Sequence, residues 1–196
     1  MPTEVDHEPQ LSFLEDLPLA HAAVQFAVRQ HAGQRRASDH AAFVVHPLEV
    51  ASLLALSGYP DHVVAAGVLH DVLEDTDAQR QDLESRFGAS VANLVAAISD
   101  DPTIDDERER KEELRERVRR LGGYPAALYA ADKISKVREL RTLMAAGANR
   151  EEIEPALIRH RSSLAMLDDT IPGSRLVDIL RFEIEALQQL PPPDED

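Results

Sequence analysis

The chain has 196 residues and a formal net charge of −15, because 36 acidic side chains outnumber 21 basic ones. Such a surface repels phosphate backbones, so a nucleic-acid binder is disfavoured, and an anionic small molecule would need a local metal ion or Arg/Lys cluster. The chain has no cysteine, an acidic start without signal-peptide character, and no apolar run near the roughly 20 residues that span a bilayer. We therefore expect a cytoplasmic protein without disulfides or a membrane span.

The hydrophobic pattern predicts an all-α fold. Apolar residues recur at spacings of three and four, and no segment alternates as a strand would. We expect one domain over residues 13–190, between a flexible segment at 1–12 and a disordered acidic tail at 191–196. The predicted helices cover residues 12–30, 46–57, 60–74, 77–87, 89–98, 105–121, 124–144, 150–169 and 174–190.

The segment at 105–121, "DDERERKEELRERVRRL", is the most highly charged of these helices. It could bind a partner protein, but a solvated helix with internal ion pairs is the favoured interpretation.

The stretch "VLHDVLEDT", residues 68–76, carries four ionisable side chains in an otherwise apolar segment. At about 100° per residue, with His70 at zero, Glu74 lies at about 40°, Asp71 at about 100° and Asp75 at about 140°. Apolar residues fill the opposite face. Because buried carboxylates persist only when they are paired or bound to metal, this acidic face predicts a metal site.

Two further residues fit the same site. His46 begins the helix of "FVVHPLEVA", and Asp132 lies within an apolar turn of "YAADKISKVREL". With His70 and Asp71 they form two imidazoles and two carboxylates from three helices. Such a mixed set suits Mn²⁺, Fe²⁺, Zn²⁺ or Co²⁺ rather than Ca²⁺, and on an octahedral ion it leaves two positions for water and substrate.

The pattern His46…His70-Asp71…Asp132 resembles that of the HD-domain metal-dependent phosphohydrolases. A fuller set of motifs is similar to the hydrolase domain of the RelA/SpoT proteins, and most of all to the stand-alone small alarmone hydrolases. These motifs are "HAGQRR" (31–36), "HPLEVA" (46–51), "LHDVLEDT" (69–76), "FGASVANLV" (87–95) and "ADKISKVREL" (131–140). The resemblance implies an HD-type helical bundle around a single metal site. It also implies hydrolysis of the 3′-pyrophosphate of ppGpp or pppGpp to GDP or GTP and pyrophosphate.

The resemblance also implies a role for each site residue. The two histidines and two aspartates named above would hold one Mn²⁺, or another divalent transition metal. Glu74 and Asp75 would activate and orient the attacking water. Arg36 matches the arginine that contacts the guanine base, with Arg35 as its neighbour.

Two departures from the family pattern lie on the substrate side. Lys136 replaces an asparagine that touches substrate, and it could either bind a phosphate or be a surface lysine. The loop "HAAF" at 40–43 replaces Gly-x-Pro-Tyr and keeps only the aromatic residue, as Phe43. Hydrolysis of another nucleotide, such as a nucleotide monophosphate or a phosphorylated dinucleotide, therefore stays open. So does a non-catalytic domain that senses nucleotide.

Two other histidine-containing motifs have less definite roles. His31 is expected to pack at a helix end. The stretch "RHR" at 159–161 could supply phosphate contacts.

Overall fold

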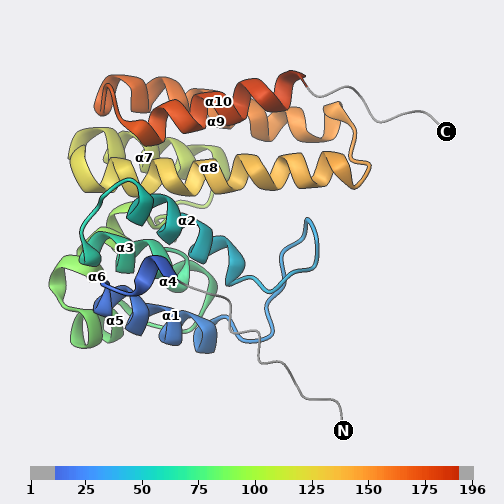
Figure 1. The fold of residues 1–196 in the computed structure, drawn as a ribbon. Helices are drawn as coiled ribbons and strands as arrows, with labels where there is room; N and C mark the ends of the chain where they lie inside the picture. Colours follow the sequence, from blue (N-terminus) through green and yellow to red (C-terminus); the bar gives the residue numbers. More distant parts are fainter. Residues whose placement is uncertain (1–11, 190–196) are drawn as a thin grey trace, which may run out of the picture.

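The computed structural model describes residues 12–189, and within them the regular structure is helical (Figure 1). The elements are η1 (Ser12–Leu14), α1 (Pro18–Gln30), α2 (Val45–Leu56), α3 (Asp61–Leu69), α4 (Val72–Asp75), α5 (Arg80–Phe87), α6 (Ala89–Ile98), α7 (Glu107–Leu121), α8 (Gly123–Ala145), α9 (Arg150–Thr170) and α10 (Arg175–Gln189). This part of the chain has no strand, only an isolated bridge between Arg35 and Ala42. The all-α prediction is confirmed. The flexible segment predicted at 1–12, apart from Ser12, and the predicted acidic tail lie outside the described residues.

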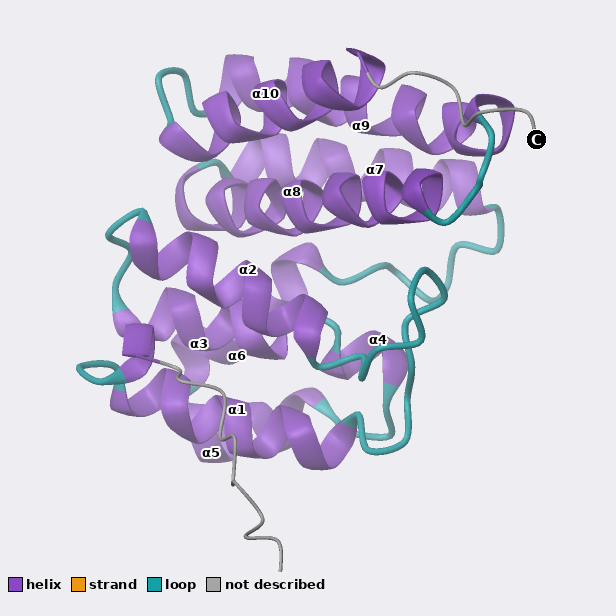
Figure 2. Cartoon of the chain, turned by 45° about the vertical axis from the view of Figure 1, so that its right-hand side comes forward, coloured by secondary structure: helices purple, strands orange, loops and turns teal. Residues whose placement is uncertain are grey.

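The helices form two layers, with α7 to α10 in one and α1 to α6 in the other (Figures 1 and 2). Long helix α8 contacts α2 on one side and α9 and α10 on the other, while α3 packs between α1 and α2. Because α2, α3 and α8 meet at the boundary of the layers, side chains on all three can converge there.

Helices α2 and α3 pack unusually closely near the end of α3. A Cβ on Gly67 would lie 2.7 Å from Leu54 Cδ1 and 3.4 Å from the Cα of Ala51, so a glycine is needed for this approach. The contact holds the start of α2, with His46, against the end of α3, with His70.

Two predicted helices are interrupted in the structure. The helix predicted over 60–74 breaks after Leu69, and His70 and Asp71 form the turn that separates α3 from α4. Asp71 has φ −90° and ψ −6°, which departs from α-helical values. The helix predicted over 12–30 is divided because α1 begins at Pro18, a residue that favours the first turn and lacks an amide hydrogen for a preceding turn.

The charged helix α7 is mostly exposed and buries only Leu114 and Val118. Arg117 pairs with Glu113, and Arg119 with Glu116, one turn away in each case. These internal ion pairs agree with a solvated helix. None of the described helices is both long and apolar enough to cross a membrane.

Candidate metal centre and active site

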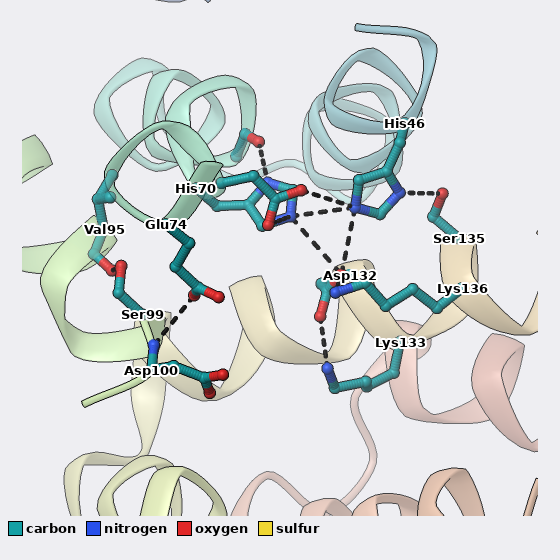
Figure 3. Close-up of polar contacts among 12 residues, drawn as sticks. His46, His70, Glu74, Val95, Ser99, Asp100, Asp132, Lys133, Ser135 and Lys136 are labelled. Carbon is teal, nitrogen blue, oxygen red and sulfur yellow. Dashed lines mark hydrogen bonds and ion pairs between the residues drawn. The ribbon is translucent and has the colours of Figure 1, made fainter. Parts of the chain in front are cut away.

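His46 and His70 face each other in the interior, with their Nε2 atoms 3.1 Å apart (Figure 3). The Nδ1 of His70 lies 2.9 Å from the carbonyl oxygen of Gly67, and the Nδ1 of His46 lies 2.8 Å from Ser135 Oγ. A carbonyl oxygen only accepts, so His70 carries a proton on Nδ1. Two imidazole nitrogens this close need a positive charge between them, which is either a proton or a metal ion.

Two carboxylates complete the group. Asp132 Oδ1 lies 3.3 Å from His46 Nε2 and 3.6 Å from His70 Nε2. Asp71 approaches the same nitrogens, at 3.4 Å from His46 and 3.1 Å from His70. Donor atoms of His46, His70 and Asp132 all lie within 4.8 Å of one another, so one ion could contact all three. The structure therefore brings the four predicted ligands together, and their donors fit a divalent transition metal.

The charges in this group are strongly coupled. Burial lowers the pKa of His70, but Asp71 and Asp132 outweigh it and raise that pKa to about 10. Burial raises the pKa of Asp71, yet His70 and Lys136 hold it well below the usual range. For Asp132, Lys133 and Lys136 overcome burial and lower the pKa in the same way. Both carboxylates are thus ionised at neutral pH, as metal ligation requires.

Two lysines of α8 flank Asp132. Lys136 Nζ lies 3.1 Å from its Oδ1, and the lysine side chain is 39% exposed, so it points toward the site rather than away from it (Figure 3). Lys133 Nζ lies 2.6 Å from Oδ2 and 4.4 Å from the ring centroid of Tyr129. Lys133 was not among the predicted site residues, although its place directly after Asp132 was a usable signal.

Glu74 and Asp75 lie on α4, one turn beyond the candidate ligands. Glu74 Oε1 accepts a hydrogen bond of 3.0 Å from the amide of Asp100, which fixes its carboxylate beside the site (Figure 3). Burial raises the pKa of Glu74, and the charges of Asp100 and Asp71 raise it further. Burial also raises the pKa of Asp75, with Asp71 adding to the effect. A carboxylate whose pKa is shifted toward neutrality suits proton transfer.

A cavity of about 250 Å³ opens onto this group. It brings the predicted substrate residues Arg35, Arg36 and Lys136 together with His46 and Asp71. The full lining is Arg35, Arg36, Ala37, Phe43, His46, Asp71, Glu74, Asp75, Lys136 and Glu139. Three cations thus line the cavity wall around two of the candidate ligands.

The wall formed by Glu74 and Asp75 also borders a larger cavity of about 650 Å³, which Arg110 and Arg117 help to line. Residues 159–161 line neither of the two cavities.

The loop before α2 shapes the mouth of the smaller cavity. Arg36 forms an ion pair with Asp39, and Arg35 donates to the carbonyl oxygen of His40 at 3.2 Å. Phe43 packs against His31, with ring centroids 4.8 Å apart. The aromatic residue of the altered "HAAF" loop therefore lies at the site, and His31 packs beside it, as expected.

Residues 23–159 match the profile of the HD domain family. The chain belongs to this family. The sequence resemblance is thereby confirmed, together with the helical bundle that it implied.

Several relatives of this HD domain carry a specific name. The MESH1 proteins of Danio rerio and Homo sapiens are named guanosine-3′,5′-bis(diphosphate) 3′-pyrophosphohydrolases. The first is 31% identical over 134 residues, covering 67% of this chain and 74% of the relative. The second is 33% identical over 135 residues, covering 67% and 75%. An Aquifex aeolicus protein with the same enzyme name is 32% identical over 120 residues, covering 60% of this chain and 17% of its own longer chain.

A solved structure of a metazoan ortholog of SpoT, described as hydrolysing ppGpp, has the same fold. It matches with a TM-score of 0.77 and 26% identity, covering 89% of this HD domain and 97% of that chain. A Listeria monocytogenes protein matches with a TM-score of 0.65 and 26% identity, covering 72% and 92%.

Proposed function

We propose that this HD domain is a metal-dependent hydrolase that removes the 3′-pyrophosphate of ppGpp or pppGpp. The observation that carries the proposal is the cavity in which His46 and Asp71 meet the cations of Arg35, Arg36 and Lys136. Metal ligands beside three cations suit a phosphorylated substrate, which the net charge of −15 would otherwise repel. The names of the relatives specify the nucleotide.

His46, His70, Asp71 and Asp132 would hold the ion, and we propose Mn²⁺ because the donor set mixes nitrogen and oxygen. A divalent ion in this position supplies Lewis-acid polarisation of a phosphoryl oxygen and lowers the pKa of water. Other divalent transition metals suit the same donors.

The protein's own groups carry the remaining steps. Arg35, Arg36 and Lys136 bind and orient the anionic nucleotide. Glu74 accepts a proton from the attacking water, while Asp75 beside it helps to orient that water. The water oxygen bonds to the phosphorus attached to the 3′ oxygen, and the bond between that phosphorus and the 3′ oxygen breaks. The 3′ oxygen takes up a proton, so the products are GDP or GTP and pyrophosphate.

The test is incubation of the purified protein with ppGpp and Mn²⁺, with products resolved by ion-exchange chromatography. Stoichiometric GDP and pyrophosphate are expected, and the Asp132→Asn variant should yield neither. Binding of ppGpp without turnover would overturn the enzymatic proposal. Release of free phosphate from another nucleotide, with ppGpp left intact, would overturn the substrate assignment.

A further inference from the structure

A chain of side-chain contacts runs outward from His46 across three helices. The Nδ1 of His46 contacts Ser135 Oγ at 2.8 Å, and that hydroxyl donates to Glu49 Oε2 at 2.6 Å. Arg138 Nη1 donates to the other oxygen of Glu49 at 2.8 Å, while its Nε donates to Glu183 at 2.6 Å. We call these five residues the His46 relay. It links α2, α8 and α10.

The direction of each proton in the inner half of the relay follows from the chemistry of its groups. A carboxylate only accepts hydrogen bonds, so the single hydroxyl proton of Ser135 is used toward Glu49. The Oγ atom must then accept from His46, which places a proton on Nδ1. The Nε2 atom, which faces His70 and Asp132, is left with its lone pair free for a metal ion.

The two histidines obtain this same tautomer in different ways. His70 donates to the backbone carbonyl of Gly67 in its own helix, a contact that no side-chain substitution removes directly. His46 depends instead on Ser135 and Glu49, which are 89 and 3 residues away from it in sequence. The orientation of His46 is therefore the part of the site that side chains outside the ligand set control.

The outer half of the relay holds Glu49 in place. The Glu49 side chain is 26% exposed and could otherwise turn toward solvent, but Arg138 grips it from α8. Arg138 is itself held by Glu183, a carboxylate only 6% exposed on α10, which also accepts from Arg141 at 2.9 Å. A buried carboxylate with two guanidinium partners is a firm anchor.

We propose that Ser135 and Glu49 are positioning residues that set the tautomer and orientation of His46 for metal binding, with Arg138 and Glu183 as their anchor. The inference rests on the metal site invoked in the proposed function, and it concerns metal affinity rather than the identity of the nucleotide. Partners of metal-bound histidines typically contribute about 10- to 100-fold in metal affinity.

The experiment measures Mn²⁺ binding in the absence of nucleotide, by titration with the free ion detected by electron paramagnetic resonance. Ser135→Ala and Glu49→Ala should each raise the Mn²⁺ dissociation constant by about 10- to 100-fold. Ser52→Ala is the matched control, since Ser52 lies on α2 close to Glu49 but outside the relay, and it should leave the constant unchanged.

Thermal melting of the metal-free variants separates this effect from misfolding. Because Glu49 is partly exposed, Glu49→Ala should fold even if Ser135→Ala does not. If folded Glu49→Ala binds Mn²⁺ as tightly as the wild type, the proposal is wrong. If only Ser135→Ala weakens binding, the relay beyond Ser135 is also wrong. A protein with the expected Mn²⁺ affinities but no activity on ppGpp would instead refute the proposed function and leave this inference standing.

Discussion

His160 on α9 makes the stability of the fold depend on pH. Its side chain is 9% exposed, and its Nδ1 is buried without a hydrogen-bond partner. Burial, reinforced by the positive charge of Lys133, lowers the pKa of His160 from 6.5 to about 3; Asp132 opposes the shift, while Lys136 and Arg159 add to it. At neutral pH this histidine is therefore uncharged in the folded protein.

The sign and size of the effect follow from proton linkage. Below pH 6.5 the unfolded chain takes up a proton at this position while the folded protein does not, so the free energy of unfolding falls as the pH falls toward 3. Each pH unit is worth about 1.36 kcal/mol, so lowering the pH from 7 to 5 removes about 2 kcal/mol. The value at pH 5 hardly changes if the folded pKa is a unit higher or lower.

The variant His160→Leu removes the titrating group and should lack this part of the pH dependence. Urea unfolding followed by circular dichroism at pH 7 and pH 5, without divalent metal, gives the loss of stability for each protein. The wild type should lose about 2 kcal/mol more than His160→Leu over this interval. The variant His21→Leu, on the exposed face of α1, controls for loss of a histidine as such. Equal losses in wild type and His160→Leu would show that His160 is not a buried neutral histidine.

Three further predictions test the candidate site directly. Glu74→Gln should keep its metal, measured by elemental analysis, yet lose about 10²- to 10⁴-fold in turnover of ppGpp; loss of the metal would instead make Glu74 a ligand. Lys136→Ala should raise KM with kcat less affected, since a phosphate contact acts on ground and transition states alike, and unchanged kinetics would mean that Lys136 does not bind substrate. A chelator should lower the melting temperature and Mn²⁺ should restore it, because an ion at 100 times its Kd adds about 2.7 kcal/mol to stability; an unchanged melting curve after verified metal removal would count against a buried site.

The sequence was most informative where chemistry and local pattern coincide. His70 and Asp71 are adjacent, and His46 and Asp132 each stand out against apolar neighbours, so their convergence could be expected from residue types and spacing alone. The break in the helix at His70 and Asp71 could not, because the apolar pattern continues through it without a proline or glycine. Local periodicity reports which face is buried, but it does not register a turn that keeps the same face.

Contacts between distant segments were beyond the reach of the sequence. Ser135 and Glu49 are 86 residues apart, and nothing in either motif indicates that they meet. The amide of Asp100, which holds Glu74, belongs to an acidic stretch that resembles an ordinary helix start. Lys136 illustrates the intermediate case, since its spacing from Asp132 allowed both a site and a surface position, and only the packing of α8 distinguishes them.

The burial of the four candidate ligands also has a kinetic consequence. Their side chains are only 3% to 10% exposed, and the cavity lined by Arg35, Arg36 and Lys136 reaches two of them, His46 and Asp71. An ion exchanging with solvent through that cavity would use the same passage as the nucleotide. A bound nucleotide then acts as a stopper, so the rate at which the ion dissociates should fall as the passage fills, and a protein at work would retain its metal longer than an idle one.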